Sequence, residues 1–296
     1  MSQFSIRDIE RLTGIKAHTL RIWEQRYNLP KPKRTDTNIR FYDDEDLKLL
    51  LNISMLNRYG HKISDITRFS RTEMLEKVAN YAKEETLQRQ DQQQDLQIQA
   101  LIFAMLNLDE RSFERTLGQS ILKMGLEKTI VNVLFPFLRT VGQLWQSGSI
   151  NPAYEHFMTN LIRMKILVAI DSIDVEPATN PKKFILFLPQ GESHEIGLLY
   201  AHYIIKSKGH NVLYLGQNLP FDDLEKVYEK FPADYIFTSI TMPPSNYNIN
   251  SLIENLLNHF QKSFLVITGN YIIHHLKKLP SRVMKLEKEE DLLNLL

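Results

Sequence analysis

Four short apolar runs, separated by segments of helical periodicity, constrain the fold of this chain more than any other feature. They lie at residues 184–188, 212–215, 235–239 and 264–268, and a fifth candidate strand covers residues 283–286. Strands that alternate with helices predict a parallel, doubly wound sheet, which binds ligands at the carboxyl ends of its strands. We therefore predict a Rossmann-like α/β domain over residues 179–296.

A loop flanked by glycines follows the first predicted strand. It reads Gly191-Glu192-Ser193-His194-Glu195-Ile196-Gly197. A histidine at the carboxyl end of a strand is well placed to ligate a metal or cofactor above the sheet, and Gly191 and Gly197 allow a large ligand to approach closely. From these residues alone, however, an ordinary surface-loop histidine is the simpler interpretation.

The middle of the chain has helical periodicity. Apolar residues recur in four segments between about residues 96 and 173, with breaks near Leu108-Asp109, near Gly125 and at residues 147–149. This pattern predicts a four-helix bundle over residues 96–178. A polar, glutamine-rich stretch at residues 76–95 precedes it and predicts a helical linker.

Residues 1–75 predict a winged helix-turn-helix. A first helix starts after Ser5 and is broken at Thr13-Gly14, and a second runs from about Ala17 to Tyr27. Two prolines then enforce an extended segment, and a short hairpin is expected from Lys33 to Tyr42.

The charge of the chain gathers in this N-terminal part. Residues 1–75 carry 14 Lys and Arg against 10 Asp and Glu, whereas the remaining 221 residues carry 22 against 25. A basic unit on a nearly neutral body suits contact with a polyanion. The alternative is a small helical module that binds another protein.

Seven side chains are candidates for DNA contact. A recognition helix presents donors to base edges, and a wing holds phosphates. We expect His18, Thr19 and Arg21 to reach into the major groove, and Arg26, Arg34, Arg40 and Tyr42 to hold the backbone.

The same part of the chain resembles a known family. The stretch TLRIWEQRYNLPKPKRTDTNIRFYDDEDL closely resembles the MerR-type regulators, in which a T-(L/I)-R-x-W/Y-E helix precedes the Pro-x-R and R-x-Y of the wing. The resemblance covers residues 4–70. It implies that the partner of this domain is an operator in double-stranded DNA.

The histidine loop carries a second resemblance. It is similar to the D/E-x-H-x-x-G signature of cobalamin-binding domains. The resemblance implies that His194 replaces the cofactor's own base as lower ligand of cobalt, and that Glu192 fixes the tautomer of its ring. Ser239-Ile240-Thr241 resembles the S-x-L of that family, and Gly269-Asn270 stands where Gly-Gly is common. The expected cofactor contacts therefore also include Gly191, Gly197, Ser239, Thr241 and Gly269.

A third motif lies in the predicted bundle, where Trp145 is followed after nine residues by Glu155-His156. Taken alone, a core tryptophan and an acid at a helix start are the simpler interpretation. The spacing resembles that of cobalamin-dependent photoreceptor regulators of the CarH and LitR kind. The resemblance implies adenosylcobalamin as cofactor, with Trp145, Glu155 and His156 against its 5′-deoxyadenosyl group.

One departure from that family concerns light. Its light-sensing members commonly have, directly after the tryptophan, a histidine that captures cobalt after photolysis, and Gln146 stands there in this chain. An amide is a much poorer ligand for cobalt than imidazole. Three alternatives follow: His156 substitutes, the readout differs, or the signal is the presence of the cofactor.

The motifs together predict a regulator without enzymatic activity. The resemblance implies a transcriptional repressor that forms a homo-oligomer, dimer or tetramer, whose state and DNA avidity change with adenosylcobalamin and with light. One alternative is a MerR-type regulator whose C-terminal domain has lost cobalamin and responds to another ligand or partner. A corrinoid carrier of a methyltransferase is a further alternative, which the N-terminal module disfavours.

The composition excludes several kinds of site and several cellular locations. The chain has no cysteine, which excludes disulfides, cysteine-based zinc sites and iron–sulfur clusters. It has no apolar run of membrane-spanning length, and its first residues are too charged for a signal peptide. The expected location is therefore the cytoplasm, with no membrane partner.

Overall fold

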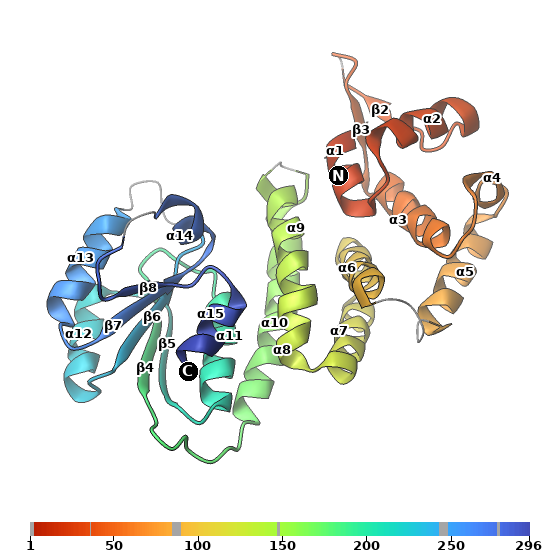
Figure 1. Ribbon diagram of the computed structural model, residues 1–296. Coiled ribbons are helices and arrows are strands. Elements are labelled where there is room, and N and C mark those ends of the chain that lie inside the picture. The colour runs from red at the N-terminus through yellow and green to blue at the C-terminus, as the bar shows by residue number, and fades with distance from the viewer. Residues whose placement is uncertain (1–2, 36, 85–89, 147–148, 243–247, 277–278) are drawn as a thin grey trace. The chain divides into compact units, whose positions relative to one another are not determined.

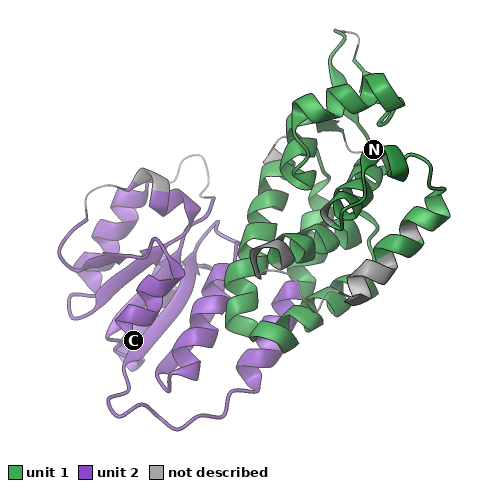
Figure 2. Ribbon diagram, turned by 45° about the vertical axis from the view of Figure 1, so that its right-hand side comes forward, with its two compact units in different colours: residues 1–161 green, residues 162–296 purple. Residues whose placement is uncertain are grey.

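The structure is a computed structural model that describes residues 3–35, 37–84, 90–146, 149–242, 248–276 and 279–296. The chain divides into two compact units, residues 1–161 and residues 162–296, which Figure 2 shows in green and purple. The division falls inside the helix Pro152–Asp171, so this helix contributes to both units. Within the described ranges, no helix is both long and apolar enough to cross a lipid bilayer.

The first unit begins with a small sheet and several helices (Figure 1). Its elements are β1 Phe4–Ser5, α1 Ile6–Thr13, α2 Ala17–Tyr27, β2 Lys33–Arg34, β3 Arg40–Tyr42, α3 Asp44–Arg58, α4 Ile63–Ile66 and α5 Arg71–Glu84. The three strands pair antiparallel in the order β1-β3-β2. The predicted helix-turn-helix and the hairpin that follows it are confirmed.

Side-chain caps define the turn between the first two helices. Ser5 and Asp8 form a reciprocal capping box at the start of α1, and Gly14 ends the helix with a φ of 74°. The carboxylate of Glu10 then accepts a hydrogen bond of 3.0 Å from the backbone N–H of Ala17. An acid before the first turn of α2 satisfies an N–H that has no partner within the helix. The angle of the helix-turn-helix is thus set by local chemistry.

Four helical stretches follow, as the periodicity predicts. They are α6 Gln90–Leu106, α7 Glu110–Met124, a stretch made of α8 Leu126–Thr129, the π-helical turn η1 Ile130–Leu134 and α9 Phe135–Gln146, and finally α10 Pro152–Asp171. Asp109 caps α7, and Gly125, with a φ of 81°, separates α7 from α8. Pro136 has no N–H to donate to the preceding turn, which is consistent with the widening of the helix just before it.

Buried hydrogen bonds join the helix-turn-helix to the helical region inside the first unit. The carbonyl of Thr13 accepts a bond of 2.6 Å from Ser54 Oγ and one of 3.4 Å from Gln99 Nε2. Ser149 Oγ donates to Asp8 Oδ2 over 3.2 Å, and both side chains are buried. The C-terminal end of α1 and its capping box therefore both touch residues of the helical region.

The second unit is a doubly wound parallel sheet. After α10 it contains β4 Lys183–Pro189, α11 Ile196–Ser207, β5 Asn211–Leu219, α12 Phe221–Lys230, β6 Tyr235–Ser239, α13 Ile249–His259, β7 Phe264–Thr268, α14 Asn270–His275, β8 Val283–Lys285 and α15 Glu289–Leu295. All neighbouring strands are parallel, in the order β5-β4-β6-β7-β8. The predicted fold class, including the fifth strand, is confirmed.

The strand β4 lies between β5 and β6, and it is buried on both faces. On one face, Ile185 and Phe187 belong to a core that also contains Leu224 of α12 and Ile253 and Leu256 of α13. The helix α11 lies on the other face (Figure 1). The order of the strands reverses at β4, because the chain leaves it for β5 on one side and later returns to β6 on the other. Ligands bind parallel sheets at such a switch point, above the carboxyl ends of the strands.

Candidate functional site

The predicted ligand loop lies at this switch point, between the end of β4 and the start of α11. Gly191 has a φ of 88°, and its N–H donates a bond of 2.9 Å to Asn218 Oδ1 at the end of β5. His194 stands two residues before the first residue of α11, with 40% of its side chain exposed. The loop is therefore tied to the neighbouring strand while its histidine reaches the surface.

Glu192 holds the ring of His194. This carboxylate is 2% exposed, and its Oε1 lies 2.5 Å from His194 Nδ1 and accepts the backbone N–H groups of Ser193 and His194. Its Oε2 accepts the N–H groups of Thr241 and Met242 over 2.8 and 3.0 Å. Burial would raise the pKa of Glu192, but the bonds from His194 and from these backbone groups lower it to about 2. An ionised Glu192 favours the ring proton on Nδ1, which leaves Nε2 as the unprotonated nitrogen of the ring.

Two further predicted contacts lie at the end of β6. Thr241 meets Glu192 through its backbone, and Ser239 is buried, with its Oγ 3.6 Å from the place where a Cβ on Gly197 would be. Both residues are among the cofactor contacts that the resemblance implies. The structure brings Ser239, Thr241 and Gly197 together with Glu192 around one loop.

Gly269 follows β7, and the packing of the backbone around it requires a glycine. Its φ is 106°, and a Cβ at this position would come within 2.2 Å of the carbonyl oxygen of Ile240. The backbones after β6 and β7 thus approach so closely that only glycine fits.

Sequence reasoning missed a second buried carboxylate in this loop. Glu195 is 5% exposed, and it binds Arg163 of α10 and Tyr214 of β5. Its partners are 32 and 19 residues away, and no local pattern connects them.

The other three predicted cofactor residues belong to the first unit. Trp145 lies in the last turn of α9 and is 37% exposed, so it is not the core residue of the simpler interpretation. Glu155, in the first turn of α10, accepts a bond from Thr159 Oγ1 over 2.8 Å and lies 3.3 Å from His156 Nδ1. Gln146 is the last residue of α9, and its side chain lies outside the described part of the structure.

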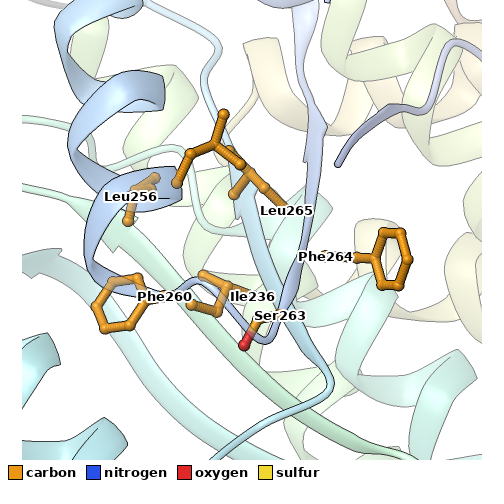
Figure 3. A pocket seen from close by; sticks show the side chains of 7 residues that line it. Ile236, Leu256, Phe260, Ser263, Phe264 and Leu265 are labelled. Atoms are coloured by element: carbon orange, nitrogen blue, oxygen red, sulfur yellow. The ribbon is translucent and has the colours of Figure 1, made fainter. Parts of the chain in front are cut away.

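A separate shallow hollow lies between α13 and the sheet (Figure 3). Ile236 and Leu265, near the amino ends of β6 and β7, line it together with Phe260. It has no room even for a water molecule, whereas ligand pockets usually have about 300–1,000 Å³. This hollow is small and apolar, and it lies at the opposite ends of the strands from His194.

The DNA-binding candidates on α2 point outward. His18, Arg21 and Arg26 are exposed, and Thr19 is half-buried beside His18, whereas Leu20 and Trp23 are buried. This helix therefore offers a polar and basic face, as a recognition helix requires.

The two wing arginines share one partner on α2. Glu24 Oε2 accepts a bond of 2.8 Å from Arg40 Nε, and Glu24 Oε1 lies 3.3 Å from a terminal nitrogen of Arg34. Arg34 also donates to Asn38 at the tip of the hairpin. The wing is thus braced against the recognition helix. Tyr42 corrects the prediction, because its side chain is 1% exposed and packs in the core of the domain instead of facing DNA.

Two family models match parts of the chain. Residues 4–73 match the family model described as "MerR HTH family regulatory protein", and residues 97–169 match the one described as "B12 binding domain". The chain is a MerR-type transcriptional regulator with a B12-binding domain. The second match covers most of α6 through α10 of this regulator, and so includes Trp145, Glu155 and His156.

The regulator is similar to two repressors of Myxococcus xanthus over most of its length. It is 24% identical to the HTH-type transcriptional repressor CarH, over 87% of this chain and 85% of that protein. It is 26% identical to the HTH-type transcriptional repressor CarA, over 93% of this chain and 89% of that protein. Among solved structures, the monomethylamine corrinoid protein of Methanosarcina barkeri covers 65% of the regulator and 92% of its own chain, with 14% identity and a TM-score of 0.51. This last likeness concerns the fold alone.

Proposed function

We propose that this regulator is a repressor that binds adenosylcobalamin and changes its affinity for a DNA operator when the cofactor binds. The observation that carries the proposal is the pair formed by His194 and the buried Glu192 at the switch point of the sheet. The similarity of the chain to two repressors over most of their length supports repression as the effect on transcription.

The residues of the loop fit a corrinoid. Imidazole is a ligand that suits cobalt, and the ring of His194 is half-exposed. Its Nδ1 is bound to a buried carboxylate, which orients the ring as metal-binding histidines require. We propose His194 as the lower ligand, with Gly191, Gly197, Ser239, Thr241 and Gly269 around the cofactor. When bound, adenosylcobalamin supplies a cobalt–carbon bond that light can break.

The helical region supplies the residues proposed for the adenosyl group. Trp145 offers an exposed aromatic face, and Glu155 and His156 offer a polar pair that is already in contact. We propose that these three side chains contact the adenosyl group and so report its presence. Light is a second proposed input. Because an amide is a poor ligand for cobalt, Gln146 would not supply a second ligand after photolysis, so the illuminated state would differ from one in which two histidines bind cobalt.

Oligomerisation is the proposed link between the cofactor and DNA. A dimer or tetramer joins several DNA-binding domains, and linked domains bind far more tightly than single ones. We propose that cofactor binding changes the number of copies that associate. Light scattering in the dark, with and without adenosylcobalamin, measures this directly, and a monomer under both conditions contradicts it.

The test of cofactor binding is an absorption spectrum of the purified regulator. The protein is mixed with adenosylcobalamin in the dark, desalted, and measured before and after green light. We expect corrinoid absorption to remain in the wild type and to fall about tenfold or more in His194→Ala, because the variant lacks the lower ligand. The matched control is His259→Ala, which removes a histidine of α13 in the same domain.

Each outcome has a distinct meaning. If no corrinoid survives desalting of the wild type, the C-terminal domain has kept its fold and taken another ligand or partner. If corrinoid is retained equally by wild type and His194→Ala, the cofactor binds but His194 is not its ligand. A change of spectrum and of size on illumination adds light to the signals that the regulator senses.

A further inference from the structure

The side chain directly after the proposed cobalt ligand is a buried carboxylate held from both sides. Glu195 Oε2 lies 2.6 Å from Arg163 Nε on α10, and Glu195 Oε1 accepts a bond of 2.7 Å from the hydroxyl of Tyr214 on β5. Only 7% of the Glu195 side chain is exposed. A buried carboxyl group requires hydrogen-bond partners for both oxygens, and Glu195 has them.

The position of Glu195 in the chain makes this arrangement unusual. It is the N-cap residue of α11, yet its side chain makes no capping hydrogen bond to that helix. The shorter side chains preferred at this position, such as that of Asp, usually accept an N–H of the first turn. Here the carboxylate reaches instead to α10 and β5, so it fixes the loop to two other elements.

The partner on β5 is itself held in place. The ring of Tyr214 stacks on His202 of α11, with 4.9 Å between ring centres and 15° between planes. Burial, and then the bond to Glu195, raise the pKa of Tyr214, so its hydroxyl keeps the proton that it donates. The ring of Tyr214 is therefore held in place, and its hydroxyl donates to Glu195 from a fixed direction.

We propose that Glu195 is a positioning residue for His194: by anchoring the loop to Arg163 and Tyr214, it sets where the imidazole stands above the sheet. This inference rests on the proposed function of His194 as lower ligand of cobalamin. The two glutamates divide the task. Glu192 sets the rotation and tautomer of the ring, and Glu195 sets the position of the backbone from which the ring projects.

The test uses Glu195→Gln, Tyr214→Phe and Arg163→Met in the full-length chain, with Arg163→Lys as the conservative variant. The matched control is Lys206→Met, because Lys206 also ties α11 to α10, through a bond of 2.8 Å to the carbonyl of Ile170, but does not touch Glu195. Circular dichroism confirms folding of each variant. If Glu195→Gln does not fold, Tyr214→Phe, which removes one hydroxyl, decides the question.

The readout is electron paramagnetic resonance of the protein loaded with cob(II)alamin, after growth with ¹⁵N-histidine. A ¹⁵N ligand splits the cobalt lines into doublets, whereas the cofactor's own ¹⁴N base gives triplets, so the spectrum reports whether histidine is the ligand. We expect a full doublet in the wild type and in Lys206→Met. In Glu195→Gln, Tyr214→Phe and Arg163→Met we expect the histidine-bound fraction to fall by about tenfold at most, and partial recovery in Arg163→Lys.

The outcomes separate the two claims. If the wild type shows no doublet, the proposed function fails, and the positioning role fails with it. If the wild type shows the doublet and Glu195→Gln and Tyr214→Phe show it undiminished, the function stands and the positioning role is overturned. Hydrogen exchange of residues 191–197 without cofactor adds an independent check, since exchange there must accelerate in Arg163→Met and not in Lys206→Met.

Discussion

At the scale of single residues, the chemistry of the ligand loop is set by carboxylates that have little access to water. Glu192 accepts three bonds on one oxygen and two on the other. Such a carboxylate stays ionised despite burial, because its hydrogen bonds outweigh the cost of desolvation. The imidazole of His194 is therefore oriented before any ligand arrives, which removes part of the entropic cost of binding.

A half-buried histidine, His202, gives the C-terminal domain a dependence on pH. Burial, and then the charge of Lys206, lower the pKa of His202 from 6.5 to about 4, and within the described residues its buried Nδ1 has no hydrogen-bond partner. Below pH 6.5 the unfolded chain binds a proton that the folded domain does not. The folded state therefore loses stability as the pH falls from 6.5 to about 4, by about 3 kcal/mol at most.

The variant His202→Phe tests this prediction. Phenylalanine keeps an aromatic ring beside Tyr214 but does not titrate. Urea unfolding of both proteins at several pH values between 7 and 4 gives the difference in their free energies of unfolding. We expect this difference to shift in favour of the variant as the pH falls, and a difference that stays constant over this window contradicts the assignment.

At the scale of elements, the wing and the recognition helix form one body. Glu24 on α2 binds Arg40 of β3 and Arg34 of β2, while Lys33 of β2 reaches the N-cap residue of α3, Asp43, over 2.6 Å. These ion pairs fix how far the wing lies from α2. A fixed separation allows both to engage one stretch of duplex.

Arg40 and Glu24 can be separated by the salt dependence of DNA binding. On a duplex of arbitrary sequence, we expect Arg40→Ala to weaken binding and to reduce the slope of log affinity against log salt by about 1, because a phosphate contact is lost. We expect Glu24→Gln, which retains both arginines, to weaken binding with an unchanged slope. If Arg40→Ala also leaves the slope unchanged, Arg40 braces the wing and does not contact phosphate.

The helices and strands were predictable from local sequence patterns. The side-chain hydrogen bonds and ion pairs between them were not. Alternation of apolar runs with helical segments predicted the parallel sheet, and Gly14, Gly125 and the prolines predicted where helices end. The same sequence placed Tyr42 at the DNA surface, although it is a core residue of β3. The bonds of Glu24 and Glu195 join residues 16 and 32 positions apart, and no periodicity reports such a distance.

At the scale of the whole molecule, the helix-turn-helix and the helical region belong to one compact unit. The bond from Ser149 to Asp8 is notable here, because Ser149 follows the proposed adenosyl-contacting Trp145 by four residues and Asp8 belongs to the capping box of α1. A buried bond to a carboxylate contributes about 1.5–3 kcal/mol. The segment that precedes α10 and the first helix of the helix-turn-helix are thus joined by a hydrogen bond.

This connection predicts an effect at a distance in the sequence. We expect Ser149→Ala, in the helical region, to lower the protection of the α1 amides against hydrogen exchange by about tenfold. The control is Ser172→Ala, which removes a serine hydroxyl that bonds the carbonyl of Val168. Unchanged protection of α1 in Ser149→Ala means that the two parts are stable independently of each other.

The central claim is that cobalamin at His194 controls DNA binding, and one measurement addresses it directly. Purified regulator selects fragments from a genomic DNA pool in the dark, with and without adenosylcobalamin, alongside His194→Ala. We expect the wild type to enrich a common sequence to an extent that depends on the cofactor, and His194→Ala to enrich it equally under both conditions. Equal enrichment by the wild type with and without adenosylcobalamin contradicts the account, and leaves a DNA-binding protein that cobalamin does not control.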